Sequence, residues 1–248
     1  MRINVLGVGF DNVTMAEAVD RGMELLRQEG AHYVVTPNPE IVEVCRENPE
    51  AMEAVNGADL VLADGIGVIK GAAMLGTPLK ERTPGVEFAA HLVERMAGEG
   101  KSLYLLGGKP GVAETAATRL TEKYPDASIV GINDGYFKND AEIIEKINAS
   151  GADILFVCLG APKQEKWIFA NKDKLKVSLA MGLGGSLDVY AGTVKRAPDI
   201  FIKLNLEWFY RLLKQPKRIG RMMNLPKFLF GTIFYKLSGK DKKNSKKA

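Results

Sequence analysis

Seven short apolar runs alternate with longer segments of helical periodicity along most of the chain. The runs are INVLGV, HYVVT, LVLA, LYLLG, SIVGI, ILFVCLG and VSLAMGL, between residues 3 and 183. Each is rich in Val, Ile or Leu and is bounded by Gly, Asn, Asp or Pro, as is typical of buried parallel strands. Residues 14–27, opened by a Thr14/Glu17 capping box, and residues 111–123 are predicted helices. The alternation predicts an α/β fold with a Rossmann-like, mostly parallel sheet flanked by helices.

The pattern changes after Thr193, where Ala197-Pro198 interrupts the chain. The following segment is predicted to be helical and apolar on most of its circumference, with breaks at its prolines. The helices expected there are residues 199–215, 217–224 and 226–237. The chain is therefore expected to divide into an α/β core at residues 1–194, a helical basic-amphipathic C-terminal appendage at 195–237 and a disordered basic tail at 238–248.

The charge of the chain changes at the same boundary. Residues 1–194 hold 19 Lys and Arg against 27 Asp and Glu, whereas residues 195–248 hold 15 against 3. This asymmetry indicates an anionic partner for the last segment: nucleic acid, an anionic membrane surface or a phosphorylated ligand. The large aliphatic residues of the basic segment and the acidic core make nucleic acid the least favoured of the three.

The longest apolar run of the basic segment is FLFGTIFY, residues 228–235. It is far shorter than the roughly 20 residues that a membrane-spanning helix needs. Two arrangements remain, and they are compatible: the segment lies on the membrane surface with its aromatic residues in the interface, or its apolar face packs on the core.

The cysteines and the N-terminus indicate a cytoplasmic location. The only two cysteines, Cys45 and Cys158, lie in apolar runs, which is typical of reduced proteins with small buried thiols. The N-terminal sequence lacks the apolar stretch and the cleavage site of a signal peptide.

Polar residues follow the predicted strands at the sheet edge where α/β proteins bind ligands. Thr36 and Asn38 come after HYVV, and Asn38 is suited to cap a helix that has Pro39 at its first position. Asp64 comes after LVLA, where a carboxylate is suited either to cap a helix or to act as a general base. Both interpretations stay open for each residue.

Three further candidates follow later strands. Gly107 and Gly108 form a turn that either presents backbone N–H groups to a phosphate or simply connects a strand to a helix. Tyr136 is placed either to stack on a base or to fill a half-buried structural position. Gln164, at the start of a predicted helix, either holds a hydroxyl-rich ligand or caps that helix.

The sequence lacks several common motifs. It has no complete G-x-G-x-x-G, no Walker loop, no Asp-x-Asp pair and no metal-spaced cluster, so no cofactor or metal is expected. An enzyme that released a nucleoside diphosphate would then need cationic side chains at its leaving group. Arginines suit phosphate oxygens, and three of them stand among aromatic residues of the basic segment. These predicted lipid-diphosphate-binding residues are Arg211, Arg218 and Arg221.

Eight motifs occur in one order along the chain: TPNPEIV, LADGIGV, ERTPGVEF, LGGKPGVAE, GYF, LGAPKQEKW, GLGGSLDVYAGTVKRAP and LEWFYRLLKQPKR. In these motifs the chain, from about residue 2 to 235, resembles the bacterial WecG/TagA/CpsF glycosyltransferases, glycosyltransferase family 26. The members that it resembles most transfer N-acetylmannosamine from a UDP donor to undecaprenyl-diphosphate N-acetylglucosamine. They form a β1,4 linkage with inversion in wall teichoic acid linkage-unit synthesis.

The resemblance implies roles for individual residues. It implies that Asp64 is the general base for the acceptor hydroxyl and that no metal is used. It further implies that the appendage meets the membrane and covers the site, which makes the protein peripheral on the inner face of the cell membrane. Glu87 departs from the family pattern, in which Asp is usual. The residues implied to line the pocket are Thr36, Asn38, Arg82 and Gln164.

Other functions are compatible with these residues. Members of the family also use N-acetylmannosaminuronic acid or glucose donors. A UDP-sugar hydrolase or epimerase would need no lipid acceptor, and a membrane-associated nucleotide-binding module would need no catalytic Asp64. The sequence leaves open whether the chain forms a homo-oligomer.

Overall fold

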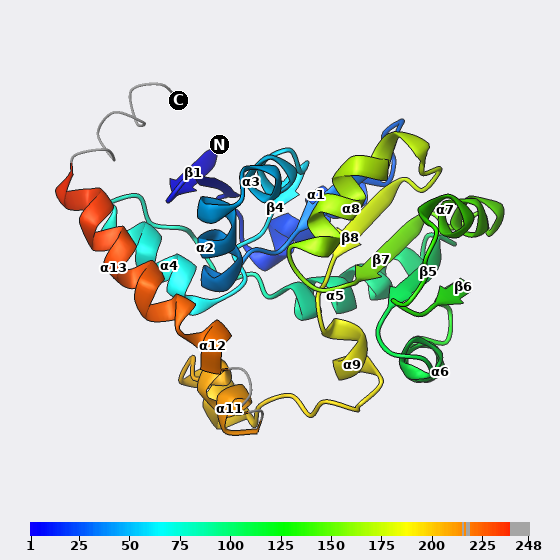
Figure 1. Cartoon of the computed structure of the whole chain (residues 1–248). Coiled ribbons are helices and arrows are strands. Elements are labelled where there is room, and N and C mark those ends of the chain that lie inside the picture. Colours follow the sequence, from blue (N-terminus) through cyan, green and yellow to red (C-terminus); the bar gives the residue numbers. More distant parts are fainter. Residues whose placement is uncertain (215, 217–218, 239–248) are drawn as a thin grey trace.

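A six-stranded parallel sheet forms the centre of the protein (Figure 1). The computed structural model describes residues 1–214, 216 and 219–238. The strand order is β4-β3-β8-β7-β5-β6, and every pairing is parallel, which confirms the predicted fold class. The strands are β3 (His32–Val35), β4 (Leu60–Val61), β5 (Ser102–Gly107), β6 (Ser128–Asn133), β7 (Ile154–Cys158) and β8 (Leu179–Gly182).

Helices cover both faces of this sheet. Successive residues of a strand point to opposite faces, and in β7 Leu155 and Val157 join one hydrophobic cluster while Ile154 and Phe156 join the other. The first cluster includes α2 (Pro39–Glu47), α3 (Pro49–Asn56), α4 (Ile66–Met74), α7 (Asp140–Ala149) and α8 (Lys163–Asn171), the last followed by a 3₁₀ turn at Lys172–Lys174. The second includes α1 (Met15–Leu25), α5 (Gly85–Ala97), α6 (Val112–Lys123) and α9 (Ser186–Tyr190).

The first apolar run, INVLGV, is not a strand of this sheet, contrary to the expectation from its composition. It forms most of a separate antiparallel hairpin of β1 (Arg2–Val5) and β2 (Val8–Asp11). Leu6 and Gly7 make the two-residue turn, both with positive φ, the geometry that matches the twist of a tight hairpin. The hairpin packs its apolar side chains on the core, which explains why its composition resembles that of a central strand.

Several local predictions are confirmed. Thr14 and Glu17 form the capping box of α1, and Asn38 caps α2 with Pro39 in its first turn. Cys45 and Cys158 are buried and free.

The appendage contains four helices within the described residues rather than the three expected. They are α10 (Asp199–Lys203), α11 (Glu207–Lys214), α12 (Ile219–Met222) and α13 (Asn224–Leu237). The single helix expected at residues 199–215 is broken because Asn205 takes a left-handed conformation, with φ 58°. The N–H of Asn205 donates to Ile202 and that of Leu206 donates to Phe201, the hydrogen bonds that end a helix in a Schellman motif. Pro226 does not interrupt α13, because it lies in the first turn.

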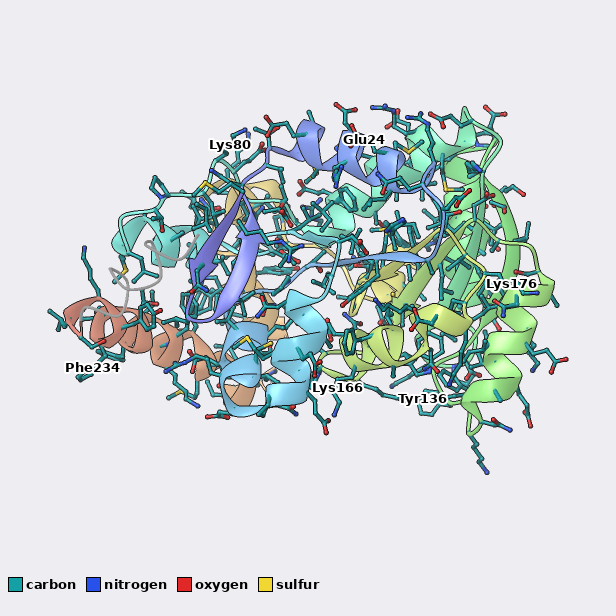
Figure 2. The ribbon with its side chains drawn as sticks, turned by 90° about the horizontal axis from the view of Figure 1, so that it is seen from above. Glu24, Lys80, Tyr136, Lys166, Lys176 and Phe234 are labelled. Carbon is teal, nitrogen blue, oxygen red and sulfur yellow. The ribbon has the colours of Figure 1, made fainter. Side chains whose placement is uncertain are left out.

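The last helix, α13, docks on α2 and α4 (Figure 1). Phe228 and Thr232 are fully buried, and the Phe228 ring lies so close to Gly71 of α4 that a Cβ there would be 2.8 Å from it. The opposite side of α13 is exposed, and Phe234 projects from it at 72% exposure (Figure 2). One apolar face of the appendage therefore packs on the core, as one of the two sequence interpretations expected.

No helix among the described residues is long and apolar enough to cross a bilayer. The predicted boundary between residues 194 and 195 stays a prediction. Of the predicted disordered tail, residues 239–248 lie outside the described residues.

Candidate active site

A cavity of about 870 Å³ opens at the carboxyl edge of the parallel sheet. Residues that follow β3, β4, β5, β6, β7 and β8 all line it, because the carboxyl ends of parallel strands meet at one edge. Seven of the eight residues predicted to act in or beside a pocket of the core line this cavity. They are Thr36, Asn38, Asp64, Arg82, Gly108, Tyr136 and Gln164.

The exception is Gly107, which does not line the cavity. It has φ 133°, and a Cβ at this position would lie 2.3 Å from the carbonyl oxygen of Cys158 on the neighbouring strand. Gly107 therefore permits the close approach of β5 and β7. The N–H of Gly108 already donates to the same carbonyl oxygen, at 3.2 Å.

Asp64 lies between β4 and α4 and is half-buried. It does not cap α4, because Gly65 is the N-cap and no side chain supplies the capping hydrogen bond. Its Oδ2 instead accepts the N–H of Gly85, the first residue of α5, at 3.4 Å. The positive end of the α5 dipole favours a negative charge there. Asp64 is thus a carboxylate on the cavity wall that lies between the end of β4 and the start of α5.

Thr36 and Asn38 each make a structural contact. The hydroxyl of Thr36 donates to the carbonyl oxygen of Gly182 at 3.2 Å, which ties the end of β3 to the end of β8. The Oδ1 of Asn38 accepts the N–H of Ile41 at 3.0 Å, as the capping interpretation expected. Because capping uses only the carbonyl oxygen, the Nδ2 group is what Asn38 can offer to a ligand.

Arg82 connects the core side of the cavity to the appendage. Its Nη1 lies 3.8 Å from Oε2 of Glu207, the first residue of α11, and both side chains are largely buried. The N–H of Thr83, the next residue, donates to Ala63 at 2.9 Å, so the Arg82 segment runs beside the end of β4. Lys109 and Lys163 also line the cavity, so three cationic side chains of the described residues surround it. Four carboxylates line it as well, those of Glu40, Asp64, Asp188 and Glu207.

Tyr136 is 66% exposed, which does not fit a half-buried structural role. It lies on the cavity lining just after β6, and its ring is accessible to a flat ligand. The neighbouring Phe137 is the structural aromatic residue, because it packs edge-on against Trp167 with ring centroids 6.0 Å apart.

Gln164 is buried at the start of α8 and makes two hydrogen bonds through its amide. Its Oε1 accepts the N–H of Gly184 at 2.9 Å, and its Nε2 donates to Oε1 of Glu165 at 2.8 Å. The side chain thus holds the loop after β8 at the cavity wall. Burial raises the pKa of Glu165 above its usual range.

This shift predicts a pH dependence of stability. Because the pKa of Glu165 is higher in the folded state, the folded protein holds this proton more tightly, and the free energy of unfolding falls as the pH rises from the unfolded-state pKa through the folded-state pKa. We expect Glu165→Gln to abolish this fall in the free energy of unfolding, because Gln does not titrate. The difference in Tm between this variant and the wild type should therefore shift in favour of the variant from pH 5 to pH 8. The thiol of Cys45, whose pKa is raised by burial and by Glu165, faces the same carboxyl group and stays neutral in this range.

Calorimetric scans at both pH values check this expectation, with Glu122→Gln on the exposed surface of α6 as the control. A Tm difference between Glu165→Gln and the wild type that did not change with pH would contradict it.

Sequence reasoning missed the residues that the appendage and the β8–α9 loop bring to the cavity. Asn205, Glu207, Trp208 and Leu225 line it from the appendage, Gly185 lines it from the loop, and Ser186 and Asp188 line it from α9. One signal was available: Glu207 is one of only three acidic residues after residue 194.

The predicted lipid-diphosphate-binding arginines cannot be placed in the same way. Arg218 lies outside the described residues, and so do the side chains of Arg211 and Arg221, of which only the helical backbone is described. Glu87, the departure from the family pattern, accepts a hydrogen bond from Arg196. Among the described residues, no three His, Cys, Asp or Glu side chains gather as a metal site would require.

The fold is that of a Rossmann-like α/β protein, and acidic and basic side chains together line the cavity at the carboxyl edge of its sheet. The chain matches the family model described as "Glycosyl transferase WecG/TagA/CpsF family" over residues 3–242. It is 37% identical, over 92% of its length and 91% of the relative's, to the N-acetylglucosaminyldiphosphoundecaprenol N-acetyl-beta-D-mannosaminyltransferase of Staphylococcus aureus strain MW2. The protein of the same name from strain NCTC 8325 has the same identity and coverage. The chain belongs to the WecG/TagA/CpsF glycosyltransferase family.

Proposed function

We propose that this glycosyltransferase moves N-acetylmannosamine from UDP-N-acetylmannosamine to undecaprenyl-diphosphate N-acetylglucosamine. The product has a β1,4 linkage, and the reaction belongs to wall teichoic acid linkage-unit synthesis. The single observation that carries the proposal is Asp64 on the wall of a cavity that Arg82, Lys109 and Lys163 also line. The names of the S. aureus relatives support the acceptor and the transferred sugar.

The proposed reaction is a single displacement. Asp64 accepts the proton of the acceptor's 4-hydroxyl group while that oxygen attacks the anomeric carbon of the donor sugar. The bond from the anomeric carbon to the UDP oxygen breaks, and UDP leaves with the electron pair. Attack opposite the leaving group inverts the anomeric centre.

The charge that develops on UDP needs cations near it. Arg82, Lys109 and Lys163 line the cavity and are suited to this task without a metal. The exposed ring of Tyr136 is suited to stack on the uracil base.

The assay that tests this function combines a short-chain lipid-diphosphate N-acetylglucosamine with a panel of UDP-sugars, with and without EDTA. The expected result is a disaccharide product from UDP-N-acetylmannosamine at a rate that EDTA leaves unchanged. If the product forms from another UDP-sugar instead, that sugar nucleotide is the donor. Consumption of UDP-sugar without the acceptor would indicate a hydrolase or an epimerase instead.

The same proposal places the protein on the cytoplasmic face of the cell membrane, held there by the appendage. Among the described residues, large apolar side chains are exposed on all four of its helices, between α10 and α11 and between α12 and α13. Lysines of the same segment are suited to anionic headgroups. The exposed apolar residues are Ile200, Leu204, Trp208, Phe209, Leu213, Ile219, Met223, Phe230, Ile233, Phe234 and Leu237.

Replacing both Phe230 and Phe234 with Ser is expected to weaken binding to anionic vesicles about 10-fold or more, because each exposed ring would bury its apolar surface in the interface. Co-sedimentation with phosphatidylglycerol vesicles measures this. The matched control is Val130→Ser, an exposed apolar residue on the edge strand β6. If the double variant binds the vesicles as tightly as Val130→Ser does, α13 does not contribute to membrane binding.

The arginines of the appendage lead to a separate expectation. Changing Arg211, Arg218 or Arg221 to Ala should raise the KM for the lipid-diphosphate acceptor more than the Kd for UDP, because guanidinium groups suit a diphosphate. Acceptor kinetics and UDP titrations measure the two effects. Equal losses for both ligands would assign these arginines to the donor.

A further inference from the structure

Glu165 is a buried carboxyl group directly behind the cavity wall. It is 1% exposed, in the first turn of α8. Its Oε1 accepts the Nε2–H of Gln164 at 2.8 Å, and its Oε2 has no hydrogen-bond partner among the described residues. Burying such a group costs free energy, so a contribution to stability does not account for its presence.

The hydrogen bonds around Gln164 leave only one orientation for its amide. The backbone N–H of Gly184 can only donate, so the atom that faces it at 2.9 Å must be the carbonyl oxygen of Gln164. The amino group of Gln164 then faces Glu165, which must accept. Without Glu165, one of the two hydrogen bonds that define this orientation is lost.

The loop that Gln164 holds belongs to the cavity. Gly184 has φ 55°, and Gly184, Gly185 and Ser186 all line the cavity directly after β8. Thr36 holds the chain two residues before Gly184, because its hydroxyl donates to the carbonyl oxygen of Gly182. A change in the Gln164 amide would therefore reach the cavity wall through this loop.

Glu165 itself does not line the cavity, so its effect on a ligand has to pass through Gln164. The Nε2 group of Gln164 carries two hydrogens. One is donated to Glu165, and the other remains for an oxygen acceptor. The raised pKa of Glu165 favours the neutral acid, which still presents a carbonyl oxygen to Gln164.

We propose that Glu165 is a positioning residue that fixes the Gln164 amide, so that its oxygen holds the Gly184 loop and its second Nε2 hydrogen serves an oxygen of the bound sugar. This inference rests on the proposed function, because the ligand it concerns is the sugar of that reaction. Its effect should appear in transfer kinetics only while Gln164 is present.

A double-mutant cycle tests this role. Glu165→Met keeps the approximate volume but cannot accept the hydrogen bond, and we expect it to lower kcat/KM about 5- to 10-fold. Glu165→Gln retains a carbonyl oxygen and should stay within about 2-fold of the wild type. In the Gln164→Ala background, Glu165→Met should cause no further loss of kcat/KM.

Two outcomes would overturn the positioning role. One is a loss from Glu165→Met that is the same with and without Gln164. The other is a Glu165→Gln variant that is as slow as Glu165→Met although it is fully folded at the assay temperature. If Glu165→Met does not fold, Glu165→Asp replaces it, because the shorter side chain withdraws the acceptor while keeping the carboxyl group. Its loss of kcat/KM should likewise disappear in the Gln164→Ala background.

The cycle separates this inference from the proposed function. If the wild type transfers sugar to the acceptor but the losses of kcat/KM from Gln164→Ala and Glu165→Met are additive, only the proposed role of Glu165 is wrong. A wild-type protein that transfers no sugar to the lipid-diphosphate acceptor would remove both.

Discussion

Replacing Asp64 with Asn is expected to lower kcat for sugar transfer about 100-fold or more, because general-base catalysis contributes at least that much. Asn cannot take up the proton of the acceptor hydroxyl. It can still accept the N–H of Gly85 through its carbonyl oxygen, so the contact with the start of α5 is preserved. The measurement is kcat with the short-chain acceptor at saturating donor, together with a thermal scan.

Asp59→Asn provides a matched control. Asp59 precedes β4 and Asp64 follows it, so the same substitution is made at opposite edges of the sheet. Asp59 also accepts a backbone N–H, that of Tyr33 at 2.9 Å. We expect Asp59→Asn to change kcat by less than about 3-fold, since its carboxylate makes a structural contact and lines no part of the cavity. Near-normal turnover by Asp64→Asn would overturn its assignment as the base.

Replacing Phe228 with Ala is expected to lower the free energy of unfolding by about 3–5 kcal/mol, the usual cost of removing a buried aromatic ring. The ring is fully buried between α13 and the core and belongs to the same hydrophobic cluster as Val5 and Val68. Urea unfolding followed by circular dichroism measures the change. The loss should appear in one transition that includes the α/β core, because the ring is shared by both parts.

Phe234→Ala on the same helix is the control, because its ring is exposed. We expect it to change the free energy of unfolding by no more than about 0.5 kcal/mol. If Phe228→Ala instead produced an early, separate transition and left the main one unchanged, the appendage would be an independent unit. The predicted boundary near residue 194 would then mark a true division of the chain.

The docking of α13 also bears on the site. The appendage reaches the cavity through Glu207 and Trp208 on α11 and Leu225 on α13, and Leu225 lies close to Gly67 of α4. The three helices α11, α12 and α13 contact one another in turn. Phe228 thus anchors on the core the last of the three helices through which α11 is connected to it.

Much of the sheet was predictable from local patterns. The apolar runs of β3 to β8 are bounded by turn residues, and Thr14 and Asn38 begin α1 and α2 where their side chains can accept the capping hydrogen bonds. The polar residues after β3, β4 and β7 converge because parallel strands bring their carboxyl ends to one edge. Asp64 was thus a site candidate before its distance to any other residue was known.

Other features depend on conformations that a residue pattern does not specify. The hairpin of β1 and β2 turns at Leu6, and a leucine with positive φ has no recognisable sequence signal. The break at Asn205 had a weak signal, because Asn takes the left-handed conformation more readily than most residues, but apolar residues on both sides favoured a continuous helix. At Leu6, whose side chain is buried, tertiary packing outweighs the local preference of the chain.

The sequence by itself determined the parallel α/β core, the position of Asp64 at the carboxyl edge of the sheet and the separation of an acidic core from a basic appendage. Strand periodicity, turn residues and charge are local properties of the chain. Only the tertiary structure decided that Phe228 is a core residue while Phe234 is exposed, that Glu207 meets Arg82, and that Glu165 stands behind Gln164. These contacts join residues by side-chain direction and by elements far apart in the chain. The direction in which each side chain points is settled only when the helices pack.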